Sequence, residues 1–159
     1  MTLVAQDILR GRRLQTDVPP DTWLHVILSA LAHDLGYLRG ICRADTGHRF
    51  LATEDGVMIE LPRGASDAAL APWHVDRSKI CVRERFAYNS LIDPERLARN
   101  IELTRFPVPN DEDHKDTRSF PGLVRAADLI GQLADPSYPS KLNALFHELN
   151  ETGIATAFR

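Results

Sequence analysis

Residues 22–38 read TWLHVILSALAHDLGYL, and this stretch decides the fold class. Its centre is apolar nearly all round, which is typical of a helix buried in the middle of a domain. Asp21 follows two prolines and is expected to cap this helix, which then ends near Gly36 or Gly40. The stretch therefore predicts a helical domain built around one buried helix.

The flanking sequence is also mainly helical. Two later helices are expected to begin at Asp93-Pro94 and Asp135-Pro136, because Asp is a preferred cap and Pro suits the first helical position. The second of these helices is expected to reach Glu151. Helical periodicity is also present over residues 2–10, from residue 74 and over residues 122–134.

Residues 49–62 have a different pattern. The β-prone runs RFLAT and VMIEL flank Asp55-Gly56, and an Asp-Gly between two such runs is a hairpin signal. We therefore expect a mainly α helical bundle with a small β-hairpin inserted at about 49–62. A length of 159 residues favours a single domain over 1–159.

The composition narrows the function classes. The formal net charge is −3, so no clear nucleic-acid surface is expected. Cys42 and Cys81 are the only cysteines and suit neither a metal knuckle nor a disulfide scaffold. The N-terminal MTLVAQDILRGRR lacks signal-peptide features, and no apolar run approaches the roughly 18–20 residues of a membrane span. The expectation is a cytoplasmic protein with no membrane partner.

Charged residues on two apolar helices form the main candidate site. Adjacent helical residues such as His33 and Asp34 point about 100° apart, so they diverge unless they sit at a helix end or face a shared cavity. Asp128 lies between Ala127 and Leu129 on another apolar helix. A divalent ion clamped between the two helices would compensate the burial of these groups. The alternative is that Asp128 pairs with Arg125, one turn earlier.

The same residues carry a family resemblance. LAHDLGYLRG (31–40) resembles the His-Asp motif of the HD superfamily, and LVRAADLIGQLADPSYPSK (123–141) resembles the helix that supplies that family's last metal-binding Asp. The segments HVDRSK (74–79) and TRFPVP (104–109) also resemble bacterial HD phosphohydrolases. The resemblance covers roughly residues 3–153 and implies an HD-domain-like helical bundle with the β-hairpin as an insertion.

The resemblance implies a set of metal ligands, His33, Asp34 and Asp128, with His33 and Asp34 as the catalytic pair. His74 is the best additional candidate ligand, and the alternative is that it only caps its helix or packs beside Trp73. Mixed imidazole and carboxylate ligands suit Mn²⁺, Fe²⁺, Ni²⁺, Co²⁺ or Zn²⁺, with Mg²⁺ as a further option. The family's first His has no counterpart, because residues 1–12 contain no His. Either the N-terminal helix is incomplete or the site is degenerate. His25 is a poor substitute, since it lies about 12 Å from His33 along the helix.

A phosphate substrate also needs positive side chains. Arg77 follows His74 by three residues and Arg125 precedes Asp128 by three, so both are expected to face the site, with Lys79 as a third candidate. The resulting hypothesis is a metal-dependent phosphohydrolase or phosphodiesterase that acts on a nucleotide or another small phosphoester. The alternative is a catalytically impaired HD module that senses a nucleotide or a partner protein. A homodimer is left open.

Overall fold

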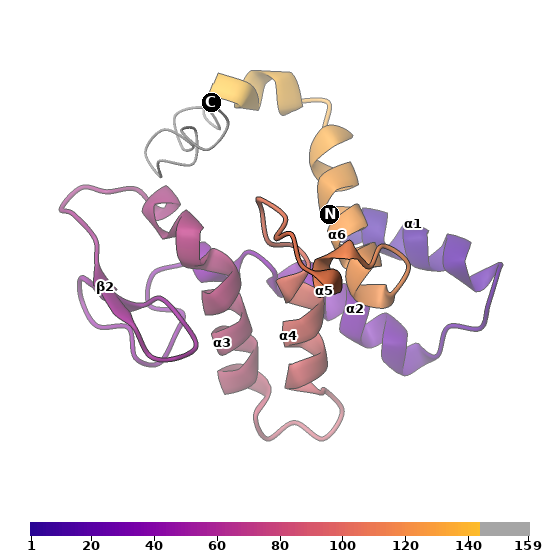
Figure 1. Ribbon diagram of the computed structural model, residues 1–159, viewed down its shortest axis with the longest axis horizontal. Helices are drawn as coiled ribbons and strands as arrows, with labels where there is room; N and C mark the ends of the chain where they lie inside the picture. The colour runs from indigo at the N-terminus through magenta and orange to yellow at the C-terminus, as the bar shows by residue number, and fades with distance from the viewer. Residues whose placement is uncertain (144–159) are drawn as a thin grey trace.

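The computed structural model describes residues 1–143, and within them the protein is mainly helical with one small antiparallel sheet, as the sequence predicted. The elements in chain order are α1 (Thr2–Arg13), α2 (Pro20–Ala32), the 3-10 turn η1 (Leu35–Tyr37), β1 (Arg49–Leu51), β2 (Met58–Glu60), the 3-10 helix η2 (Asp67–Trp73), α3 (His74–Phe86), α4 (Pro94–Glu102), α5 (Glu112–Lys115) and α6 (Phe120–Leu133). In Figure 1, α3 and α4 lie side by side in the middle, with the sheet on one side and α1, α2 and α6 on the other.

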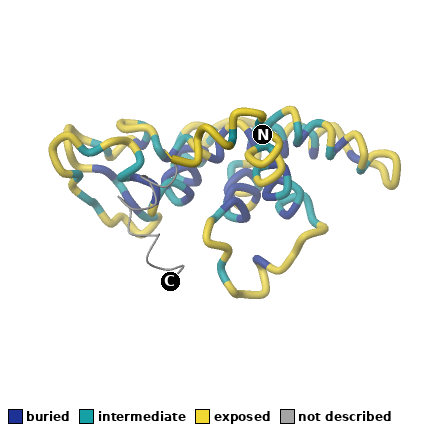
Figure 2. Tube along the Cα trace, turned by 90° about the horizontal axis from the view of Figure 1, so that it is seen from above, coloured by how far each residue is buried: buried dark blue, intermediate teal, exposed yellow. Residues whose placement is uncertain are grey.

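Helix α2 joins two hydrophobic cores. The first is formed by α1, α2 and α6, and it includes Ala30 near the end of α2. The second is formed by α3 and α4 together with Ala32, the last residue of α2. Figure 2 shows the buried positions along the inner sides of the helices and the exposed positions on the outer loops. The residues that follow α2, His33 and Asp34, therefore lie where the two cores meet.

The helix starts follow the capping rules in part. Asp93 caps α4 as predicted, and its side chain accepts from the backbone N–H groups of Glu95 and Arg96. Helix α2 instead starts with Pro20 in its first turn, so Asp21 lies inside the helix and does not cap it. Its backbone carbonyl accepts from Nδ1 of His25 at 2.7 Å, and Nε2 of His25 accepts from the N–H of Asp93 at 2.9 Å. The Nδ1 bond of His25 thus lies within α2, and its Nε2 bond holds α2 to the start of α4.

The hairpin is present inside the predicted range. Strands β1 and β2 are antiparallel, with Phe50 opposite Ile59. Gly56 has a φ of +91°, which explains why the turn uses the Asp-Gly pair: a left-handed residue is strained with any side chain other than glycine's.

Only the first part of the helix predicted from Pro136 to Glu151 lies within the described residues. Residues 138–143 are helical, and the remainder lies outside the described residues. None of the helices within residues 1–143 has the length and apolar character needed to cross a bilayer.

Candidate metal and proton site

The His33-Asp34 pair sits at a helix end, where its side chains converge. Helix α2 stops at Ala32, His33 is its C-cap residue, and η1 begins at Leu35. Nε2 of His33 lies 3.0 Å from Oδ2 of Asp34. This is the arrangement in which adjacent residues can act together, because the helical separation of about 100° no longer applies beyond the cap.

Asp128 reaches the same imidazole from α6. Its Oδ1 lies 3.4 Å from Nε2 of His33, and its side chain is only 13% exposed. Gln132, one turn further along α6, donates to that oxygen at 3.1 Å. Arg125 donates instead to the backbone carbonyls of residues 114 and 116. Asp128 therefore pairs with His33, and the alternative of an Asp128–Arg125 pair is wrong.

The two carboxylates change the acid–base behaviour of His33. Burial disfavours the imidazolium, but the hydrogen bonds and charges of Asp128 and Asp34 outweigh it and raise the pKa of His33 to about 9. Burial likewise opposes ionisation of Asp34, and the hydrogen bond and charge of His33 more than compensate, so the pKa of Asp34 is lowered. At neutral pH, these shifts favour the imidazolium form of His33 and the ionised form of Asp34.

His74 stands next to this cluster at the start of α3. Its ring stacks on Tyr37 with the ring centroids 4.5 Å apart. Burial lowers the pKa of His74, and the charges of Asp34 and His33 also act on this imidazole. Nδ1 of His74 lies 2.6 Å from the carbonyl of Ala71, just as Nδ1 of His33 lies 3.1 Å from that of Ala30. Each Nδ1 must donate to its carbonyl, and this orientation is typical of histidines that bind metals through Nε2.

Gly36 allows the turn after His33-Asp34 to approach α3 closely. A Cβ built on Gly36 would lie 1.9 Å from the backbone oxygen of His74. No rotamer change can relieve a clash with backbone, so a side chain at residue 36 must push the turn away from α3. Gly36 is thus a condition for placing His33 and His74 together.

We expect Gly36→Ala to destabilise the protein by roughly 1–3 kcal/mol, because it overpacks this contact. Gly11→Ala is the matched control, since it lies in α1 with no atom within 4 Å of its added Cβ. That substitution should stabilise the protein by about 0.5–1 kcal/mol through helix propensity. Urea unfolding of both variants measures the difference, and equal effects would contradict the close-packing role of Gly36.

The structure does not place Arg77 at the site. The residue is 0% exposed, and its guanidinium donates to both carboxylate oxygens of Asp45 and to the backbone carbonyls of Gly36, Leu38 and Leu51. Every nitrogen of the guanidinium has a partner within the protein. The expectation that Arg77 contacts a substrate is corrected accordingly: this residue holds the hairpin side of the fold to the turn after α2.

Arg125 and Lys79 are also engaged within the protein. Arg125 is 9% exposed and anchors the loop before α6 through the two carbonyls named above. Nζ of Lys79 lies 2.7 Å from Glu102 and 3.3 Å from Asp76, and it also pairs with Glu54. Because three carboxylates surround the ammonium group of Lys79, this residue has no excess positive charge with which to bind a phosphate. The sequence pattern placed these cations on the correct helices but could not show their partners.

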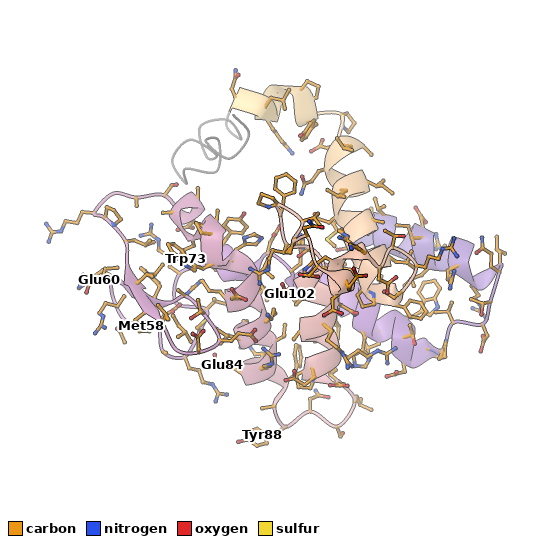
Figure 3. The ribbon with its side chains drawn as sticks, in the orientation of Figure 1. Met58, Glu60, Trp73, Glu84, Tyr88 and Glu102 are labelled. Atoms are coloured by element: carbon orange, nitrogen blue, oxygen red, sulfur yellow. The ribbon has the colours of Figure 1, made fainter. Side chains whose placement is uncertain are left out.

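A charge network beside the site was not predicted from the sequence. Arg105 donates to Glu102 and Asp76, and its charge also acts on His74. Burial of Glu102 is outweighed by its hydrogen bonds from Arg105 and Lys79, which lower its pKa to about 2. Figure 3 shows Glu102 near the middle of the molecule, at the end of α4. The acidic and basic residues come from α3, α4 and the following loop, so spacing along one helix gave no signal.

His114 is a further residue that the sequence alone did not place near the site. The polar composition of NDEDHKD (110–116) is typical of a solvated loop, yet this segment contains α5, and His114 is only 8% exposed. Its Nδ1 lies 2.8 Å from Asp111, and its Nε2 is 3.6 Å from Glu102. Arg125 holds the backbone carbonyl of His114, and this long-range contact buries a segment whose own composition is polar.

The spacing of the three side chains can be compared with the spacing of ligands around one divalent ion. Ligand atoms about 2.1 Å from one ion lie about 3.0 Å apart in octahedral and about 3.4 Å apart in tetrahedral geometry. The two carboxylate oxygens lie 3.0 and 3.4 Å from Nε2 of His33. The described part of the chain nevertheless holds no group of three or more His, Cys, Asp and Glu side chains ready to hold a metal. In the arrangement seen here the carboxylates face the proton of His33, which a metal would have to replace.

The fold and the cluster define a mainly helical protein in which a largely buried histidine lies between two carboxylates. The chain belongs to the Npun_R2479-like family, whose model matches residues 1–159. The description of that family names no activity and no HD domain. No curated protein and no solved structure matches the chain significantly.

Proposed function

We propose that this protein is an HD-type metal-dependent phosphohydrolase or phosphodiesterase that acts on a nucleotide or another small phosphoester. The observation that carries the proposal is the convergence of His33, Asp34 and Asp128, which come from the end of α2 and the middle of α6. These are the residues that the resemblance to the HD superfamily assigns to metal binding. They lie beside His74, the proposed additional ligand.

The chemistry follows from the donor set. A bound divalent cation lowers the pKa of its water toward neutrality and screens phosphate charge. His33, Asp34 and Asp128 would hold that cation, and the Nδ1 contact of His33 with Ala30 fixes which ring nitrogen is offered. Asp34 has the most accessible side chain of the three, at 58% exposed, so it faces the direction from which a substrate can enter. Two free buried cysteines, Cys42 and Cys81, suit a reducing compartment, and we propose the cytoplasm.

We expect His33→Ala and Asp128→Ala each to abolish both metal retention and phosphoesterase turnover, because each removes a donor atom from the shared ion. Elemental analysis and a screen of phosphomonoesters, phosphodiesters and nucleotides across Mn²⁺, Co²⁺, Ni²⁺, Zn²⁺ and Mg²⁺ test this. Asp7→Ala removes an exposed carboxylate on α1 and serves as control. Full activity in the Asp128→Ala protein would exclude the mechanism.

A second candidate function is a nucleotide- or protein-binding HD module without turnover. It is favoured by one observation: the carboxylates of Asp34 and Asp128 lie 3.0 and 3.4 Å from Nε2 of His33, so the three side chains are engaged with one another without an ion. Tight nucleotide binding with no turnover under any metal of the same panel would identify this function, whereas turnover of any screened phosphoester would exclude it.

A further inference from the structure

A single buried hydroxyl on α3 holds the turn that carries the His33-Asp34 pair. Oγ of Ser78 donates to the backbone carbonyl of His33 at 2.6 Å and accepts from the backbone N–H of Gly36 at 2.8 Å. Ser78 is 0% exposed, so water cannot replace it in either bond. The carbonyl at a helix C-cap lacks an intrahelical donor, and here Ser78 supplies one.

The position of Ser78 also ties this turn to His74. The two residues are four apart on α3, which puts them on the same side of the helix. Helix α3 thus carries His74 beside the cluster and, one turn later, Ser78, which hydrogen-bonds to the backbone of the turn that holds His33 and Asp34. The neighbouring Arg77 adds a bond of 2.7 Å from its Nε to the carbonyl of Gly36.

We propose that Ser78 is a positioning residue for the His33–Asp34–Asp128 site. It fixes the backbone at both ends of the turn from His33 to Gly36, and this sets the direction of the His33 ring and the Asp34 carboxylate. The role in metal binding rests on the proposed function, whereas the placement of the imidazole does not. Outer-shell partners of this kind typically change metal affinity by 10–100-fold when removed.

Ser29 provides a matched control within the same chain. It is also 0% exposed, and its Oγ donates to a backbone carbonyl, that of His25, at 2.7 Å. It accepts from Nδ2 of Asn100 at 3.0 Å. The two serines therefore make equivalent bonds in equally buried places, but Ser29 does not contact the turn that carries the site.

The experiment compares Ser78→Ala and Ser29→Ala with the unmodified protein by two readouts. The first is the NMR signals of the His33 ring in metal-free protein at one fixed pH. The second is the affinity for Co²⁺ alone, measured by calorimetry. We expect Ser78→Ala to move the ring signals and to weaken Co²⁺ binding by roughly tenfold or more. Ser29→Ala should leave both readouts unchanged while losing similar thermal stability.

Unchanged His33 ring signals in Ser78→Ala would overturn the positioning role. The ring signals could move in Ser78→Ala while neither the variants nor the unmodified protein bind Co²⁺. That result would support the positioning role of Ser78 and contradict the proposed metal site, so the two proposals can fail separately. If Ser78→Ala does not hold its fold, Ser78→Cys keeps nearly the same volume with weaker hydrogen bonds. A change in the His33 ring signals of Ser78→Cys would then support the positioning role, and unchanged signals would overturn it.

Discussion

Arg77→Leu is expected to destabilise the protein by about 3–5 kcal/mol, a large part of the stability of a domain this size. The reason is that Asp45, whose side chain is 1% exposed, would be left as a buried carboxylate without its cation. The carbonyls of Gly36, Leu38 and Leu51 would lose their donor at the same time. Leucine fills part of the space but replaces none of these bonds.

Chemical denaturation at pH 7 measures the loss. Arg83→Leu is the matched control, because Arg83 is on the same helix and pairs with Glu95, but its side chain is 34% exposed. An exposed pair of this kind contributes at most about 1 kcal/mol. Adding Asp45→Asn to Arg77→Leu should recover part of the loss, since it removes the unpaired charge. A loss in Arg77→Leu no larger than that in Arg83→Leu would show that the buried pair does not hold the fold.

Arg77 also shows what the sequence can and cannot predict. The start of α4 at Asp93-Pro94 and the turn at Asp55-Gly56 were predictable, because capping and turn chemistry depend only on neighbouring residues. The burial of Arg77 depends on Asp45, which is 32 residues away in the chain. Helical periodicity places a side chain on a face of its helix, but it does not say which partner covers that face.

The candidate site was partly predictable for the same reason. The resemblance to the HD superfamily brought His33, Asp34 and Asp128 together, and the structure places them within 3.4 Å of one imidazole nitrogen. Spacing alone left an Asp128–Arg125 pair as the alternative. Arg125 instead bonds the carbonyl of His114, and no pattern in the polar segment around His114 predicts this contact. Local signals therefore gave the elements, while pairing between distant segments needed the structure.

Metal binding should become about 100-fold stronger between pH 7 and pH values above 9. A metal can bind Nε2 of His33 only after its proton has left, and the carboxylates hold the pKa of this imidazole at about 9. At pH 7 only about 1% of His33 is then neutral, which lowers the observed affinity by the same factor. Calorimetry with Mn²⁺ in buffers of different ionisation enthalpy should show about one proton released per ion at pH 7.

The stability of the metal-free protein should change in the opposite direction over this range. Because the folded-state pKa of His33 is raised above 6.5, its stabilising contribution is fully present below pH 6.5 and is lost as the pH rises through 9. The His33 side chain is 10% exposed, and the loss is on the order of 3 kcal/mol. In Asp128→Asn both pH dependences should move to lower pH, because one of the carboxylates that hold the proton has become neutral. A metal affinity that stays constant from pH 7 to 9, without proton release, would mean that the ion binds away from His33.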